Sequence, residues 1–269
     1  MSADQAFAPT RALRFDVLTL FPELFAPFIE AGIARRAYAS GQIVLKLWNP
    51  RDFAEGNYRR VDDRPFGGGP GMVMMAEPLA RCLQAAQADR AQAQAGEAPV
   101  LLFSPIGAAL NHAAVERWSA GAGAILICGR YEGIDQRFID RHVTHQVSLG
   151  DFVLSGGEIA ALALLDAVAR LQPGVLHDEG SHQLDSFNPA VDGLLDCPHY
   201  TRPEDWDGQR VPAELLSGHH AQIERWRRGQ RLRLTATHRP DLIAAARAAG
   251  LLTAQDETLL ARLTDTAAP

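Results

Sequence analysis

Apolar and polar positions follow two alternating periods along the first two thirds of the chain. Short apolar runs predict strands at residues 14–20, 43–48, 100–103, 124–128 and about 145–149. Helical periodicity lies between and after them, at residues 23–39, 77–93, 111–119, about 133–141 and 159–171. Strands that alternate with helices are typical of an α/β protein with a parallel sheet covered by helices.

The last third has a different pattern. Periodicity disappears at 175–202, where Gly, Pro, Asp and His are frequent, and so long an irregular stretch indicates a functional segment or an interdomain linker. Further helices are predicted at 212–216, 219–228, 240–249 and 254–263. We therefore expect a loose extension at 1–13, an α/β domain at 14–174, a linker at 175–202 and a small all-helical domain at 203–269.

Three predicted loops follow strands of the sheet at their carboxyl ends. They lie at 104–107, 129–133 and 150–157, and each contains glycine. Ligands of open α/β proteins bind at this edge of the sheet. Because glycine has no Cβ, a ligand can approach its bare main chain. The pattern predicts a pocket lined by main chain from these loops.

Composition narrows the class of protein. No apolar run reaches the roughly 18 to 20 residues that span a bilayer, and the first residues lack the charged-then-apolar order of a signal peptide. Cys82, Cys128 and Cys197 are odd in number and widely spaced. This spacing argues against a disulfide framework and a zinc site, and it favours a reducing cytoplasm.

The net charge of −6 predicts no global attraction to nucleic acid, but the basic residues are unevenly placed. Six arginines lie between positions 225 and 239 with no acidic residue among them: Arg225, Arg227, Arg228, Arg231, Arg233 and Arg239. Two interpretations remain open for this stripe, a solvated helix face or a contact with a phosphate backbone.

Several motifs suggest chemistry that their spacing does not support. The glycine-rich run at 67–71 lacks the Gly-Lys-Ser/Thr of a nucleotide-binding loop, and with 61–66 it favours an ordered wall or a flap. Gly129 to Gly133 has the wrong spacing for a dinucleotide fingerprint, and the histidines match no zinc template.

Four polar residues are better candidates for chemistry. Asp185, Asp196 and His199 lie in the irregular segment, and Arg170 is a charge near the end of an apolar helix. The purely structural alternative makes Asp185 a helix cap and Arg170 an ion-pair partner.

A set of ordered motifs then resembles the bacterial tRNA (guanine-N1)-methyltransferases, the TrmD family of the SPOUT superfamily. The motifs are residues 21–23, 50–53, 61–65, 67–72, 128–135, 150–158, 185–187, 194–203 and 216–219. The resemblance runs from about residue 14 to 263. It implies a deep trefoil knot in the α/β domain and a homodimer with shared active sites. It also implies methyl transfer from S-adenosylmethionine to N1 of guanosine 37, 3′ of the anticodon in tRNA, with a C-terminal domain that grips the tRNA.

The resemblance assigns site residues as well. It places Asp185 as general base, Arg170 as the group that stabilises O6, and Ser181, Asp196 and His199 around the flipped base. From the arginine stripe, Arg225 and Arg228 are the candidates for contact with the tRNA. The implied donor pocket consists of Phe103, Ser104, Pro105, Gly129, Tyr131, Glu132, Ser148, Leu149, Gly150, Asp151, Phe152, Val153, Leu154, Gly156 and Gly157. The family also uses Mg²⁺, but no dedicated cage of carboxylates is evident in this sequence.

The chain departs from the family pattern at a few points. Phe66 and Phe152 stand where the family often has Tyr, and the stretch between Phe187 and Leu194 is about three residues longer than usual. Two alternative functions remain open: a tRNA ribose 2′-O-methyltransferase of the same superfamily, and a non-catalytic RNA-binding protein. The first would not need the Asp185–Arg170 pair at a base edge, and the second leaves that pair unexplained.

Overall fold

The computed structural model describes residues 12–177 and 182–265, and the chain divides into two compact units between Leu176 and His177. A parallel sheet in the order β2-β1-β6-β5-β7 forms the centre of the first unit. Its strands are β1 (Leu13–Leu18), β2 (Ile43–Trp48), β5 (Val100–Ala109), β6 (Gly123–Ile127) and β7 (His145–Ser148). The predicted α/β class with a parallel central sheet is confirmed.

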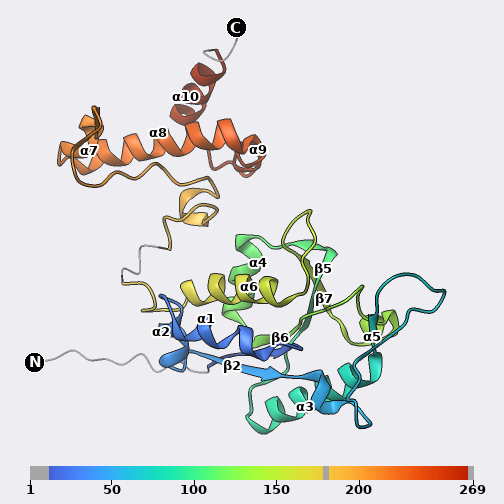
Figure 1. The fold of residues 1–269 in the computed structure, drawn as a ribbon. Helices are drawn as coiled ribbons and strands as arrows, with labels where there is room; N and C mark the ends of the chain where they lie inside the picture. The colour runs from blue at the N-terminus through green and yellow to red at the C-terminus, as the bar shows by residue number, and fades with distance from the viewer. Residues whose placement is uncertain (1–11, 178–181, 266–269) are drawn as a thin grey trace, which may run out of the picture. The chain divides into compact units, whose positions relative to one another are not determined.

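Helices cover both faces of this sheet (Figure 1). They are α1 (Ala26–Glu30), α2 (Arg35–Ala39), α3 (Ala76–Gln92), α4 (His112–Ala120), α5 (Gln136–His142) and α6 (Glu158–Arg170). Side chains of β6 alternate between the faces because successive residues of a strand point in opposite directions. Ala124 and Leu126 pack in the core that includes α6, whereas Ile125 and Ile127 pack in the core under α3.

The helix predicted at 23–39 is wrong as a continuous element. The chain forms a 3₁₀ turn, η1 (Pro22–Leu24), and then the separate helices α1 and α2. Ala31 is extended, with φ −119° and ψ 165°, and Gly32 has φ 63°. These two residues therefore interrupt the helix between α1 and α2. Glycine adopts a positive φ without steric cost, and a residue in this conformation interrupts a right-handed helix.

The loop predicted at 104–107 lies inside a longer strand. β5 pairs with β7 on both sides of it, and the register shifts between Phe103 and Ala108. A Cβ on Gly107 would collide with the backbone of Val147, so a glycine is required where the two strands meet again. The segment is therefore a bulge that displaces Ser104 and Pro105 from regular pairing.

A buried polar cluster lies under α3 at the amino end of β1, on the face opposite Phe15 and Val17. Asp16 is fully buried and accepts hydrogen bonds from Arg14 Nε at 2.9 Å and Arg90 Nη1 at 2.8 Å. Asp89 of α3 pairs with Arg14 and with Lys46, the only lysine of the chain, at 2.6 Å each. Each buried charge thus has a partner, as burial requires.

A small antiparallel hairpin, β3 (Asp62–Asp63) and β4 (Val73–Met74), carries the glycine-rich segment of the first unit. Met74 also bridges Ile134 in parallel. A further 3₁₀ turn, η2 (Pro50–Phe53), precedes the hairpin and packs against α3. Together these elements flank the loop that follows β6.

The second unit is built around one long helix. Its elements are η3 (Pro189–Val191), β8 (Asp205–Trp206), β9 (Gln209–Arg210), α7 (Ala213–Leu216), α8 (His220–His238), α9 (Pro240–Ala248) and α10 (Ala254–Asp265). Leu232 of α8, Ile243 of α9 and Leu260 of α10 form its core, and Leu194 completes that core. The stretch predicted as a linker, 175–202, is thus divided between the two units, and its later part packs on α8.

Two details of this unit differ from the prediction. The unit is not all helical, because β8 and β9 form a hairpin whose turn residues, Asp207 and Gly208, have φ values of 53° and 76°. Asp-Gly is a preferred sequence for such a turn. Helix α8 also continues ten residues past Arg228, to His238, because Gly229 is tolerated within it.

Candidate functional site

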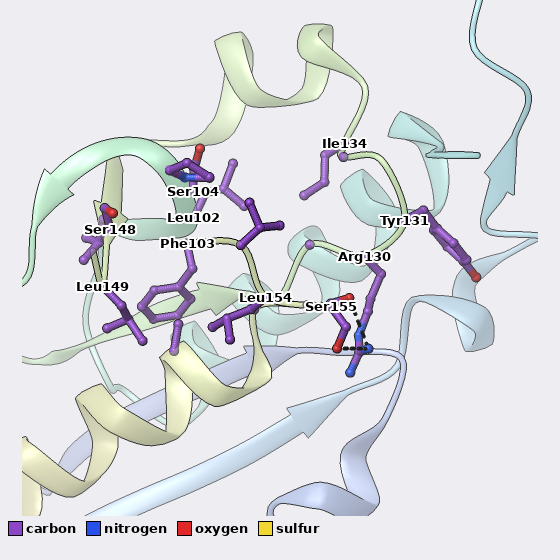
Figure 2. A pocket seen from close by; sticks show the side chains of 18 of the residues that line it. Leu102, Phe103, Ser104, Arg130, Tyr131, Ile134, Ser148, Leu149, Leu154 and Ser155 are labelled. Atoms are coloured by element: carbon purple, nitrogen blue, oxygen red, sulfur yellow. Dashed lines mark hydrogen bonds between the residues drawn. The ribbon is translucent and has the colours of Figure 1, made fainter. Parts of the chain in front are cut away.

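A cavity of about 280 Å³ opens in the first unit beside the bulge of β5 and the carboxyl ends of β6 and β7. Its walls come from the bulge of β5, the loop at 129–134 and the loop at 148–157. Figure 2 shows Phe103, Leu149 and Leu154 at one end of it and Arg130, Tyr131 and Ser155 at the other. The three segments that sequence analysis predicted to form one pocket do lie together at this edge of the sheet.

The predicted donor residues can be placed individually. Phe103, Ser104, Pro105, Gly129, Tyr131, Glu132, Ser148, Leu149, Gly150, Phe152, Val153, Leu154, Gly156 and Gly157 line the cavity. Asp151 does not contribute to its lining, although both of its neighbours in the chain do. The cavity also includes residues that sequence analysis did not select, among them Arg130, Ile134 and Ser155.

Glycines bring the main chain of two loops into contact beside the cavity. Gly157 N–H donates a hydrogen bond to the carbonyl of Gly129 at 3.0 Å, and Arg130 bridges Gly156 in antiparallel fashion. A Cβ on Gly157 would lie 2.8 Å from Cys128 Cα, which is closer than real Cβ atoms approach. The start of α6 can pass the end of β6 at this distance only without a side chain.

The glycine-rich segment supports the loop that carries Tyr131 and Glu132. Glu132 N–H donates to the carbonyl of Met72 at 3.0 Å, and Met74 N–H donates to Gly133 at 2.8 Å. A Cβ on Gly71 would collide with the side chain of Glu132. Tyr131 itself has φ 60°, and Arg51 Nη2 donates to its hydroxyl at 3.3 Å. The segment at 61–71, for which the sequence favours a wall or a flap, therefore packs against the loop that lines the cavity and supports it from behind.

Asp196 is the centre of a hydrogen-bonded group in the second unit. Its carboxylate accepts from Cys197 N–H at 2.7 Å, contacts His199 Nε2 at 2.9 Å and pairs with Arg231 Nε at 3.4 Å. Burial acts to raise the pKa of Asp196, but these hydrogen bonds and the nearby positive charges outweigh it and lower the pKa. Asp196 and His199 are thus brought together, with the imidazole largely exposed.

Asp185 and Arg170 belong to different units. Arg170 is the last residue of α6 and is half buried. Asp185 lies in a turn where its carbonyl accepts from Asn188 N–H at 3.3 Å, and its side chain is also half buried. Both residues have interaction partners within the structure. Ser181 lies outside the described residues.

Four of the six arginines of the stripe are paired with carboxylates, two of them with carboxylates from other segments. Arg228 pairs with Asp192 at 2.6 Å and with Asp256 at 2.9 Å, and buried Arg231 pairs with Asp196. Arg227 and Arg239 pair with Glu224 and Asp241. Arg225 is exposed, and its Nε donates to the carbonyl of Ala221 at 3.2 Å. The stripe thus partly stabilises the second unit. These ion pairs join residues far apart in the sequence, so the sequence alone could not reveal them.

Two negative findings apply to the described part of the chain. In residues 12–177 and 182–265, no three His, Cys, Asp or Glu side chains lie close enough to hold a metal ion. Over the same ranges, no helix has both the length and the apolar character that crossing a membrane requires.

Comparison with known proteins decides the family. The model of the family described as tRNA (Guanine-1)-methyltransferase TrmD matches residues 13–245. The chain belongs to the TrmD family. It is 72% identical over 251 residues to a tRNA (guanine-N(1)-)-methyltransferase of Polaromonas sp. strain JS666, covering 93% of this chain and 97% of that protein. Similarly named proteins of Paracidovorax citrulli and Albidiferax ferrireducens are 72% and 71% identical, over 93% of this chain and 98% and 99% of theirs.

Family membership confirms the resemblance that the ordered motifs indicated. The relatives share nearly their whole length with this chain, so the match includes both compact units. The names of these relatives describe methylation of guanine N1 in tRNA. Because function resides in a site and not in the fold alone, the cavity at this edge of the sheet is the leading candidate for the active site.

Proposed function

We propose that this protein transfers a methyl group from S-adenosylmethionine to N1 of guanosine 37 in tRNA. The observation that carries the proposal is the cavity at the bulge of β5 and the carboxyl ends of β6 and β7 in a chain of the TrmD family. It combines apolar side chains with main chain from glycine-rich loops, as a site for an adenosyl group requires. S-adenosylmethionine supplies an electrophilic methyl group on a sulfonium.

The residues of the cavity fit such a donor. Phe103, Leu149 and Leu154 offer an apolar surface for a flat base. The loops at 129–133 and 150–157 offer carbonyl and N–H groups that can bond the edge of the base, since their glycines leave main chain accessible. Glu132 supplies a carboxylate at the opposite wall, which would favour a positive charge nearby.

The methyl acceptor requires proton transfer. N1 of guanine carries a proton, so a base must remove it, and negative charge then develops on O6. We assign Asp185 as the base and Arg170 as the cation that stabilises O6, both by family resemblance. An ordinary aspartate has a pKa of about 3.9 and is a weak base. The charge of Arg170 would compensate by favouring the deprotonated guanine.

The remaining assignments concern the partners. We assign the second unit to tRNA binding, with Ser181, Asp196 and His199 near the target nucleotide and Arg225 and Arg228 near the phosphates. Arg225 is exposed and suits this role, whereas Arg228 also holds Asp192 and Asp256. The described residues offer no three-ligand metal site, so no step is assigned to Mg²⁺. We expect the protein to act in the cytoplasm.

The knot and the dimer belong to the same proposal. Close passage of Gly157 beside Cys128, with the Gly157–Gly129 hydrogen bond, supports a crossing of the chain beside the cavity. True knots are otherwise almost absent from protein folds, so this crossing would be specific to the superfamily. We further propose a homodimer in which Arg170 of one subunit and Asp185 of the other act on one guanine.

Steady-state methyl transfer to an unmodified tRNA transcript tests the two catalytic assignments. Asp185→Asn and Arg170→Gln should each lower kcat by at least about 10²-fold, the usual effect of losing a general base or an electrostatic stabiliser. Binding of S-adenosylmethionine should remain within about twofold in both variants, because neither residue lines the cavity. Either variant turning over at the wild-type rate would refute its assigned role.

A further inference from the structure

Arg130 connects two walls of the cavity through its side chain. Its Nη2 lies 2.9 Å from Glu158 Oε2. Its Nη1 donates to the carbonyl of Ser155 at 3.2 Å (Figure 2). Arg130 belongs to the loop after β6, whereas Ser155 and Glu158 lie at the end of the loop after β7 and at the start of α6. The guanidinium therefore joins two segments that are far apart in the sequence.

Glu158 is held from its other side by the residue that follows β1. It is 1% exposed, and Thr19 Oγ1 donates to its Oε1 at 2.8 Å. Thr19, which is fully buried, also accepts from Phe21 N–H at 3.0 Å. The guanidinium of Arg130 lies over the ring of Phe21 at 4.4 Å. This contact gives the Phe21-Pro22-Glu23 motif a role, because its aromatic ring is a platform for the arginine.

The absence of a side chain at Gly156 makes room for the contact between Arg130 and Glu158. A Cβ at that position would collide with Arg130 Nε and lie against Glu158 Oε2. The missing side chain thus leaves room for the ion pair directly beside residues that line the cavity. Replacing a buried ion pair with apolar residues is often neutral or stabilising, so stability alone gives weak reason for one here. A requirement for a fixed loop geometry gives a stronger one.

We propose that Arg130 and Glu158 are positioning residues that set the width of the cavity by holding segment 154–157 against the loop at 129–133. The inference rests on the proposed function, since it concerns the binding of the methyl donor. The planar guanidinium reaches Glu158 and Ser155 simultaneously, which a lysine ammonium cannot do with the same geometry. The main-chain contacts of Gly156 and Gly157 fix one end of this segment, and without the guanidinium Leu154 and Ser155 lose the side-chain contact that fixes the rest of it.

Arg130→Lys is the most informative variant because it keeps the charge that neutralises Glu158. Its dissociation constant for S-adenosylmethionine, measured by titration calorimetry, should rise at least about tenfold. In methyl transfer, KM for the donor should rise similarly, with kcat at saturating donor within about twofold of wild type. Thr19→Val should shift the donor affinity in the same direction by a smaller factor, because Glu158 keeps Arg130 but loses its hydroxyl donor.

Arg81→Lys is the matched control. Arg81 also bridges two carboxylates, those of Glu55 and Glu77, but it does not line the cavity. The control should leave donor affinity unchanged. Thermal unfolding of all variants ensures that affinities are compared between folded proteins.

The outcomes separate the inference from the proposed function. If Arg130→Lys and Thr19→Val are folded and bind the donor as tightly as wild type, the positioning role is wrong while the proposed function stands. If wild type itself does not bind the donor, the proposed donor site fails first. If both variants lower only the melting temperature, Arg130 and Glu158 are merely structural, and the inference is overturned.

Discussion

At the scale of single residues, paired charges explain why several candidate residues are where they are. Arg228 was selected for RNA binding because it lies in an arginine stripe, yet it joins Asp192 to Asp256 across the second unit. Burial raises the pKa of Asp256, but the hydrogen bonds from Arg228 and Thr253 outweigh this effect and lower it. An ion pair of this kind contributes to the free energy of unfolding, and its contribution depends on pH.

Asp256→Asn should destabilise the packing of α10 on α8. At pH 7 the loss should be about 1–3 kcal/mol, the usual value for hydrogen bonds to a charged partner. Hydrogen exchange of the α8 and α10 amides measures it locally. Asp241→Asn is the control, because Asp241 and Arg239 form an exposed ion pair in the same unit. This substitution should change the hydrogen-exchange rates little.

The pH dependence of this effect has a definite sign. The pKa of Asp256 is lower in the folded protein than the value of about 3.9 in an unfolded chain. Its contribution is therefore complete above about pH 4 and is lost as the pH falls through the folded pKa. The difference in exchange between wild type and Asp256→Asn should disappear over that range. A difference that persists below it would contradict the assignment.

At the scale of elements, glycines mark both close approaches and tolerated positions. Gly157 starts α6 against the backbone of Cys128, whereas Gly229 lies inside α8 with only ordinary contact to Leu259 at 3.7 Å. Alanine at these two positions should therefore act in opposite directions.

Gly229→Ala should stabilise the second unit by about 0.5–1 kcal/mol, because alanine favours a helix interior more than glycine does. Gly157→Ala should destabilise the first unit and weaken donor binding, because Cys128 and Gly129 cannot move away without disturbing the sheet. Urea unfolding and donor titration of the two variants measure this contrast. Equal effects of the two substitutions would show that the crossing at Gly157 is not tightly packed.

The elements that the sequence predicted best are those with a clear period. The continuous apolar run at 124–128 placed β6 within a residue, and the predicted strand ends placed three loops at one edge of the sheet. Apolar spacing alone could not show that Gly32 interrupts the helix predicted at 23–39, nor that β5 resumes after its bulge. The β8–β9 hairpin was predictable, because Asp207-Gly208 is a favoured sequence for its two-residue turn.

The candidate site was predictable to a similar degree. Loop position and family resemblance selected most of the cavity lining, and of the predicted donor residues only Asp151 does not line it. Arg130 was missed although it stands within the motif at 128–135, because its role depends on Glu158, Thr19 and Phe21 from two other places in the chain. A contact between distant segments leaves no periodic trace in a sequence.

At the scale of the whole molecule, the proposed chemistry requires residues of both compact units. Arg170 belongs to the first unit and Asp185 to the second. If each active site takes Arg170 from one subunit and Asp185 from its partner, two inactive variants can complement each other. This arrangement is isologous, so the two sites of a homodimer are equivalent.

Mixing Arg170→Gln with Asp185→Asn under conditions that exchange subunits should restore methyl transfer. Half of the dimers formed at random are mixed, and each has one intact site, so activity should reach about a quarter of wild type. Mixtures of either variant with itself serve as controls. No recovery, with subunit exchange verified, would place both residues of a site in one subunit.

The central claim is that this protein methylates N1 of guanosine 37 in tRNA. The most direct measurement is nucleoside mass spectrometry of a tRNA transcript after incubation with the wild-type protein and S-adenosylmethionine, beside a transcript with adenosine at position 37. The account predicts 1-methylguanosine in the first transcript and no methylation of the second. A 2′-O-methylated nucleoside, or methylation that survives the change at position 37, would contradict it.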